Sequence, residues 1–212
     1  MAGEIDRNQI DSEGRGRSTN KGDVPDPLLR RYYLDARGGP GLGNLGPEQA
    51  DIKLACRGLG HGNTHAIVLA PGTPEEMLYL TMHAFELSFT YRNPVIVLGD
   101  GFLGQMTGVV RLPATLRKPG RPAWAVCGDY AHHLNLICSI QLAETDLEAH
   151  NRKLNEKYAL ISAEEQRSDS FRCEDADVLV IACNTPARMA KGAVEAARTL
   201  RVRAGLFRPV TL

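Results

Sequence analysis

The chain of 212 residues has no long hydrophobic run, and this absence argues against several classes of protein. No apolar stretch approaches the ~20 residues that a bilayer-spanning helix needs, and the N-terminus has no apolar segment typical of a secretion signal. We therefore expect a cytoplasmic protein without membrane contacts. Acidic and basic residues balance at 25 each, so the zero net charge argues against a nucleic-acid partner. The 43% hydrophobic content is that of an ordinary globular protein.

Cysteine is present, but not in the spacing of a metal site. There is no Cys-x-x-Cys pair and no Cys/His pattern suited to zinc or an iron–sulfur cluster. We expect reduced, mostly buried thiols and no metal site in this chain. His132 and His133 are adjacent, so on an extended segment they would point to opposite sides. The scattered cysteines are Cys56, Cys127, Cys138, Cys173 and Cys183.

The clearest pattern lies between residues 66 and 100 and predicts a β-α-β unit. Two short apolar runs rich in β-branched residues, 66–70 and 94–98, have the character of buried strands. Strands joined by one crossover helix run parallel, and ligands of open parallel sheets bind beyond the carboxyl ends of the strands. The loops after Ala70 and Leu98 are therefore expected on the ligand side. Apolar residues recur at helical spacing between the strands, at Met77, Leu80, Ala84, Leu87 and Tyr91.

Three residues mark where this helix begins. Thr73 is a natural N-cap, and Pro74 suits the first helical position because its missing N–H would be unpaired there anyway. Glu76 stands three residues after the cap and completes a capping box. Helix entry at this point is the most secure local prediction.

The N-terminal segment and the loop that follows it contrast sharply. Residues 1–31 carry almost no large apolar side chain, so we expect them to be disordered or foreign to the fold. Tyr32 to Leu34 could end a strand.

Arg37 then opens a loop with four glycines and a proline in six residues, where Gly38 and Gly39 would allow a ligand to approach the backbone. An Arg at the mouth of such a loop can hold a carboxylate or phosphate, and a surface turn with a solvated Arg is the alternative.

The middle of the chain predicts a linker with one long helix. Residues 47–57 suggest a short helix, and residues 104–143 are irregular and rich in Pro and Gly. The pattern from 145 to 167 predicts a helix capped by Thr145 with Glu148 completing the box. Its buried stripe would comprise Leu147, Leu154, Tyr158 and Ile161.

A second β-α-β unit is predicted near the end of the chain. Residues 176–183 have the pattern of a buried strand, Thr185 and Pro186 those of a cap and first helical position, and 202–207 that of the next strand. The sheet-facing residues of the helix, which should end at about Leu200, would be Met189, Ala193, Ala196, Ala197 and Leu200. A single parallel unit of this size has too little core to stand alone.

Several long motifs resemble the alpha subunit of 2-oxoacid:ferredoxin oxidoreductases, and most closely the branch that acts on 2-oxoisovalerate (3-methyl-2-oxobutanoate). These motifs are Arg37-Gly-Gly-Pro-Gly-Leu-Gly-Asn44, Gly58-x-Gly-His-Gly62, Val68-Leu-Ala-Pro71 and Tyr91-Arg-Asn-Pro-Val-x-Val-Leu-Gly-Asp-Gly-x-Leu-Gly-Gln-Met106. Later matches are Glu174-Asp-Ala-Asp-Val and Arg208-Pro-Val-Thr-Leu212.

The resemblance implies an α/β fold in several parts. Residues 32–110 would form part of a thiamine-diphosphate-type pyrimidine-binding domain with a parallel sheet, and residues 111–173 a linker with a helix. Residues 174–212 would begin a transketolase-C-terminal-like domain, truncated after its first β-α-β unit. Carried over by position, Arg37 would contact the 2-oxoacid carboxylate, with Gly38 and Gly39 beside it.

The implied reaction is the oxidative decarboxylation of a 2-oxoacid with coenzyme A to acyl-CoA and CO2, with reduction of ferredoxin. Thiamine diphosphate would be shared with a partner subunit, and Mg2+ and iron–sulfur clusters would lie on other subunits of the complex, namely beta, gamma and ferredoxin-like delta chains. Gly99-Asp100-Gly101 resembles the start of a thiamine-diphosphate magnesium motif, but the Asn expected some 25 to 30 residues later is missing. We expect no metal ligand there and no catalytic residue in this chain.

The chain also departs from the family pattern. Family alpha subunits carry a Thr-containing substrate turn and the Glu that activates the thiamine aminopyrimidine, and residues 1–33 match neither. We expect an internal fragment, a frameshifted product or a degenerate subunit, inactive alone. A non-catalytic scaffold that keeps the α/β core is therefore the alternative function.

Overall fold

The computed structural model describes residues 31–36, 44, 46, 48–57, 64–115, 120, 122–126, 129–135 and 140–212. The chain divides into two compact units. One contains the residues up to Val110 together with Glu164–Leu212, and the other contains Arg111–Ala163. Within the described ranges, no helix is both long enough and apolar enough to cross a membrane.

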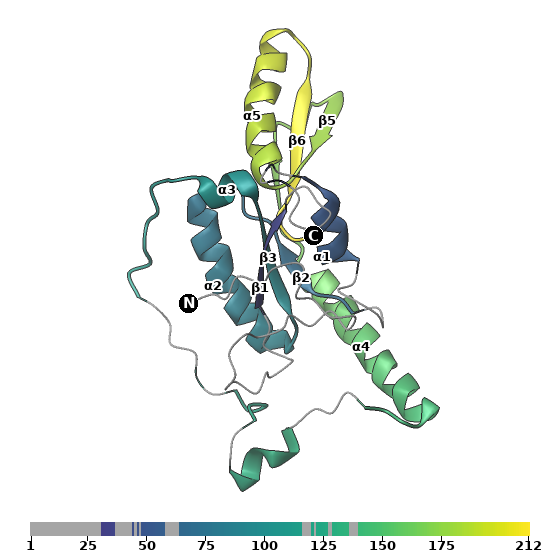
Figure 1. Ribbon diagram of the computed structural model, residues 1–212. Helices are drawn as coiled ribbons and strands as arrows, with labels where there is room; N and C mark the ends of the chain where they lie inside the picture. The colour runs from purple at the N-terminus through teal and green to yellow at the C-terminus, as the bar shows by residue number, and fades with distance from the viewer. Residues whose placement is uncertain are drawn as a thin grey trace. The chain divides into compact units, whose positions relative to one another are not determined.

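The first unit contains a parallel three-stranded sheet, which confirms the predicted β-α-β unit. Its strand order is β1 (Arg31–Ala36), β3 (Val95–Asp100) and β2 (Ile67–Leu69). Helix α2 (Pro74–Tyr91) connects β2 to β3, and α1 (Ala50–Cys56) precedes β2. Figure 1 shows α1 and α2 on opposite sides of these strands. The sheet is thus covered on both faces, as the continuous apolar strands indicate.

The register of the strands explains which side chains enter which layer. Val68 pairs with Ile96, and together with Leu98 they form one buried cluster with Ala55 of α1. Because successive side chains of a strand point to opposite faces, the buried residues between them in sequence, such as Val97, face the other side. Helix α2 provides the cover there, with Ala84 and Leu87 buried.

The beginning of α2 confirms the predicted cap and modifies the predicted box. The Thr73 hydroxyl oxygen accepts a hydrogen bond from the Glu76 N–H at 3.1 Å, and Pro74 is the first helical residue. The Glu76 carboxylate, however, accepts from the Gly72 N–H at 2.7 Å rather than from the N–H of the cap. This pairing fixes the loop that precedes the helix as well as the helix itself.

A second sheet of the same unit contains a strand that the sequence analysis did not predict. The order is β4 (Ser168–Phe171), β6 (Ala204–Pro209) and β5 (Val178–Ile181), with β5 parallel and β4 antiparallel to β6. Helix α5 (Asn184–Thr199) joins β5 to β6, which confirms the second β-α-β unit. Strand β4 was missed because Ser168 to Ser170 are exposed polar residues at an edge and carry no apolar signal.

Two predictions about burial in this region are wrong. Strand β5 is an edge strand and Ile181 is 67% exposed, so the apolar run does not mark a buried strand here. The buried face of α5 is also offset from the predicted one: Met189 is 70% exposed, and Val194 is buried against Leu206. The helix begins at Asn184 with Cys183 as N-cap, so Thr185 is not the cap.

The last residues of the chain connect the two sheets. After β6, Thr211 forms an antiparallel bridge with Leu69 of β2, and the Leu212 N–H donates to the Val68 oxygen at 2.9 Å. The Leu212 side chain packs against the cluster that contains Val68 and Ala55. The small second sheet therefore gains core from the first.

The second unit contains the 3₁₀ helix η2 (Tyr130–Asn135) and most of α4 (Glu144–Glu164). Helix α4 confirms the predicted long helix, but it starts one residue earlier, so Thr145 lies inside it rather than at its cap. In the predicted stripe Ile161 is buried and Leu147 is exposed. Helical spacing predicts a common face, but it does not determine what covers that face.

Candidate functional site

The candidate site is the carboxyl edge of the parallel sheet, where ligands of such sheets bind. Strands β1 and β3 end together here, because Ala36 pairs with Asp100. Residues 70–73 follow β2 at the same edge, and the short helix α3 (Gly101–Gln105) follows β3. The start of α5 reaches the same edge from the second β-α-β unit, because Thr185 hydrogen-bonds Asp100.

Asp100 is the central polar residue of this edge. Its side chain caps α3, with Oδ1 accepting from the N–H groups of Phe102 at 3.1 Å and Leu103 at 2.8 Å. The same oxygen accepts from the Thr185 hydroxyl at 2.8 Å, and Oδ2 accepts from the Thr185 N–H at 2.9 Å. The residue is only 3% exposed, so these four bonds replace the water that the carboxylate lost on burial.

Asn184 forms a second connection beside it. Its side-chain amide donates to the backbone oxygens of Pro71 at 3.1 Å and of Leu98 at 2.6 Å, across two strand ends of the first sheet. The residue has a φ of 54°, in the left-handed region that Asn tolerates better than most residues. The first residue of α5 thus combines a left-handed backbone with buried side-chain hydrogen bonds.

Arg208 of β6 connects the second sheet to the loop after β2. Its Nη1 atom donates to the Glu76 carboxylate and to the Asp169 carboxylate, both at 3.1 Å, and Nη2 also pairs with Glu76. A Cβ atom at Gly72 would stand 3.4 Å from the guanidinium carbon. The Arg208 guanidinium therefore lies close to this loop, and the Glu76 carboxylate accepts hydrogen bonds from both Arg208 and the Gly72 N–H.

Two half-buried cysteines lie near this edge without the properties of nucleophiles. Burial raises the pKa of the Cys56 thiol, and the neighbouring Cys183 raises it further. Burial likewise raises the pKa of Cys183, the N-cap of α5. Both thiols therefore stay protonated at neutral pH, whereas the thiolate is the reactive form. Cys56, Cys173 and Cys183 are free thiols, but they are of intermediate burial and not mostly buried as expected, and Cys127 and Cys138 lie outside the described residues.

The residues that the sequence analysis assigned to the substrate lie outside the described part of the chain. These are Arg37, Gly38 and Gly39. Ala36, the residue before them, is described and ends β1 at the candidate edge. Their proposed role toward a 2-oxoacid carboxylate therefore stays a prediction.

The carboxylates at this edge serve the structure of the chain itself. The Asp100 carboxylate accepts hydrogen bonds from α3 and Thr185, and the Glu76 carboxylate accepts them from Gly72 and Arg208. Among the described residues no group of three His, Cys, Asp or Glu side chains is placed to hold a metal ion. The described carboxylates Asp100 and Glu76 thus hold together the loops and helix starts at the carboxyl edge of the sheet.

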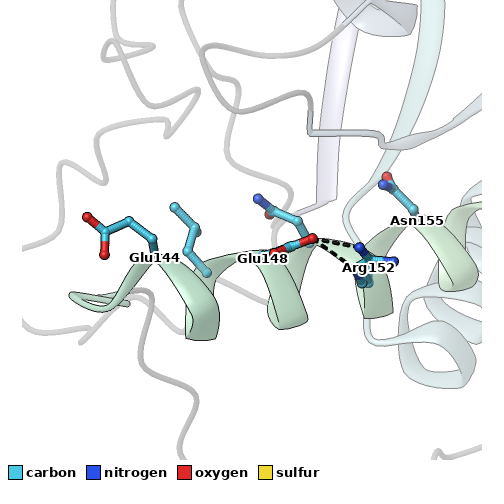
Figure 2. A pocket seen from close by; sticks show the side chains of 6 residues that line it. Glu144, Glu148, Arg152 and Asn155 are labelled. Atoms are coloured by element: carbon cyan, nitrogen blue, oxygen red, sulfur yellow. Dashed lines mark hydrogen bonds and ion pairs between the residues drawn. The ribbon is translucent and has the colours of Figure 1, made fainter.

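A shallow depression elsewhere on the chain does not have the character of a functional site. It runs along helix α4, and Figure 2 shows Glu144, Glu148, Arg152 and Asn155 as its lining residues. Glu148 and Arg152 pair with each other at 2.6 Å, one helical turn apart. The pair neutralises its own charge on an exposed helix surface, where such pairs contribute little.

Sequence reasoning missed the contribution of Asn184 and Arg208 to the edge. The Asn-Thr-Pro sequence was interpreted as the start of a helix, and the left-handed conformation of Asn184 depends on the partners Pro71 and Leu98, more than 80 residues away. The Gly-Asp-Gly sequence around Asp100 was interpreted only as a resemblance to a metal-binding motif. An Asp directly before a short helix is also a common N-cap, and this signal could have identified its role.

Comparison with known proteins shows which proteins this chain resembles. Residues 32–125 match the thiamine-diphosphate-binding domain of pyruvate flavodoxin/ferredoxin oxidoreductases. The chain is 48% identical over 178 residues to ketoisovalerate oxidoreductase subunit VorB of Methanothermobacter marburgensis, with 83% of this chain and 50% of the relative covered. It is 31% identical over 182 residues to 2-oxoglutarate synthase subunit KorA of Archaeoglobus fulgidus, with 81% and 50% covered. The chain spans about half the length of these curated relatives.

A solved structure shares the fold. The 2-oxoglutarate:ferredoxin oxidoreductase of Magnetococcus marinus, determined with 2-oxoglutarate, coenzyme A and succinyl-CoA bound, matches with a TM-score of 0.63 at 20% identity. The match covers 85% of this chain and 36% of that one. The parallel sheet, the matched domain and the similarity to VorB agree with one another, and over 83% of its length the chain is similar to a subunit of a 2-oxoacid oxidoreductase.

Proposed function

We propose that this chain is one subunit of a thiamine-diphosphate-dependent 2-oxoacid:ferredoxin oxidoreductase. The complex would decarboxylate a 2-oxoacid oxidatively, transfer the acyl group to coenzyme A and pass two electrons to ferredoxin. The observation that carries this proposal is the match of residues 32–125 to the thiamine-diphosphate-binding domain, on a chain whose first sheet is parallel and covered on both faces. The substrate we propose is 2-oxoisovalerate, because the similarity to ketoisovalerate oxidoreductase subunits is higher than that to 2-oxoglutarate synthase subunits.

The chemistry at the cofactor would be completed by other chains. Asp100 and Glu76 are engaged in structural hydrogen bonds, and the described residues offer no metal cluster. We propose that a beta subunit holds most of the thiamine diphosphate and its Mg2+, and that gamma and ferredoxin-like delta subunits accompany it. Iron–sulfur clusters on those chains would carry the electrons to ferredoxin, and the complex would work in the cytoplasm.

Within this complex the chain would provide the substrate-binding edge. Residues 32–110 would form part of the pyrimidine-binding domain, 111–173 the linker, and 174–212 the start of a transketolase-C-terminal-like domain. Arg37 follows directly after Ala36, which ends β1 beside Asp100. We propose that Arg37 binds the carboxylate of the 2-oxoacid through paired hydrogen bonds, with Gly38 and Gly39 allowing close approach.

The test is an assay on the complex that this chain forms in its own cells. The chain is tagged, isolated with its copurifying subunits, and mixed with coenzyme A, a viologen dye and either 2-oxoisovalerate, 2-oxoglutarate or pyruvate. We expect dye reduction, with the highest kcat/KM for 2-oxoisovalerate. A complex that contains the chain at full occupancy and reduces dye with none of the three oxoacids would support the scaffold function instead.

The variant Arg37→Ala tests the proposed substrate contact. Loss of a charge-assisted pair of hydrogen bonds should raise the KM for the 2-oxoacid more than about tenfold, corresponding to roughly 2 kcal/mol or more. The KM for coenzyme A serves as the internal control and should not change. An unchanged KM for the oxoacid in a fully assembled complex would refute the assignment of Arg37.

A further inference from the structure

The carboxylate of Asp100 receives hydrogen bonds from the starts of two helices, α3, which follows the first β-α-β unit, and α5 of the second unit. Two donors are backbone N–H groups of α3, and two are the hydroxyl and N–H of Thr185 in α5. Helix N-termini carry partial positive charge, so both helices stabilise the same buried negative charge. The carboxylate therefore serves both as the cap of α3 and as the acceptor that holds the start of α5.

The neighbouring Asn184 extends this connection to the other strand ends. It bonds to the backbone of Leu98, two residues before Asp100 in β3, and to Pro71 in the loop after β2. The first two residues of α5 are therefore tied to both β2 and β3 where they end. Asn184 has a left-handed backbone here, a conformation that Asn tolerates better than most residues.

We propose that Asp100 and Thr185 are positioning residues that fix the start of α5 on the carboxyl edge and so set the geometry of the 2-oxoacid site. The proposal rests on the proposed function. Asp100 is the register partner of Ala36, so a shift of the β3 end is passed through the strand pairing to the end of β1. The residue after Ala36 is Arg37, the proposed contact to the substrate carboxylate.

Two substitutions at Thr185 separate the hydroxyl from the rest of the side chain. Thr185→Val keeps the size and the backbone N–H bond but removes the hydroxyl donor to Asp100, which leaves a buried carboxylate with one partner fewer. Thr185→Ser restores the hydroxyl. Thr199→Val is the matched control, because the Thr199 hydroxyl at the other end of α5 donates only to the Ala196 oxygen, on the exposed surface.

A third variant changes Asp100 itself. Asp100→Asn keeps the shape but replaces one acceptor oxygen by an NH2 group, which would face an N–H or O–H donor. Asp177→Asn is its control, because Asp177 is an exposed Asp whose ion pair with Arg203 lies at the start of β5. All five variants are compared in the assembled complex, with kcat, the KM for the 2-oxoacid and the KM for coenzyme A measured separately.

A positioning role predicts a specific pattern of kinetic constants. In Thr185→Val and Asp100→Asn the KM for the 2-oxoacid should rise about tenfold, the fold-change expected for a lost hydrogen bond to a charged group. The KM for coenzyme A should stay within twofold, Thr185→Ser should regain most of the affinity, and both controls should match the wild type. A purely structural role would lower the melting temperature and the amount of active complex, but would leave the oxoacid KM of the remaining complex unchanged, and that outcome would overturn the proposal.

Failure of the proposed function gives a different result from failure of this inference. If the wild-type complex turns over no oxoacid, the proposed function fails, and the connection is then judged by hydrogen exchange of the Leu103 amide, which bonds Asp100 directly. Faster exchange in Thr185→Val than in Thr199→Val would support the physical coupling between α5 and the edge. Equal exchange in the two variants would refute it.

Discussion

The substitution Gly205→Ala tests whether strand β6 is packed as tightly as the structure shows. A Cβ at this position would stand 2.6 Å from the Arg172 backbone oxygen, 3.0 Å from the Ala176 Cβ and 3.1 Å from the Cys173 Cα. Ordinary contacts begin near 3.4 Å, and two of these neighbours are backbone atoms that cannot rotate away. We expect the overpacking to destabilise the fold by about 1–3 kcal/mol. For a chain of this size this lowers the melting temperature by roughly 2–12 °C.

The matched control is Gly192→Ala, in the interior of helix α5. Its Cβ would meet no atom within 4 Å, and Ala is the better helix former. We expect this change to stabilise the fold by about 1 kcal/mol, so that the two identical substitutions have opposite signs. Both variants are measured by thermal and urea unfolding under the same conditions. If Gly205→Ala is neutral or stabilising, the segment from Arg172 to Ala176 does not cross β6 as closely as described, and the reasoning fails.

Two further predictions concern the core and the dependence of stability on pH. Leu98→Ala should cost about 2–5 kcal/mol because this side chain is 0% exposed, whereas Leu142→Ala, at a residue 92% exposed, should stay within about 0.5 kcal/mol in urea unfolding. The hydrogen bond from Arg198 lowers the pKa of Asp175, so the pair stabilises the fold above the ordinary Asp pKa and this stabilisation is lost as the pH falls through the lowered value. Asp175→Asn should therefore lower the urea midpoint at neutral pH and not at a pH below the lowered pKa, and an equal loss at both would contradict this linkage.

The local predictions that succeeded depend on signals contained within a few residues. The cap at Thr73, the Pro74 start of α2 and the two β-α-β units follow from side-chain size, backbone preference and periodicity, which act over one or two turns of chain. The family resemblance likewise rests on contiguous motifs, and the comparisons agree with it.

The predictions that failed needed information about neighbours far away in the sequence. Ile181 has the composition of a buried strand, but its burial depends on whether another strand lies beside β5. Strand β4 exists because β6 offers it a free edge, and its own residues give no apolar signal. Edge position is a property of the sheet as a whole, so local pattern cannot determine it.

The sequence by itself determined the α/β class, the parallel units and the family that this chain resembles. Only the tertiary structure decided how the carboxyl edge is held together, because Asp100 and Thr185 are 85 residues apart and Glu76 and Arg208 are 132 apart. Hydrogen bonds between such residues depend on how the two β-α-β units meet, and no periodicity of the sequence records that meeting. The sequence therefore predicts the individual helix and strand ends at this edge. Only folding brings their hydrogen-bond partners together.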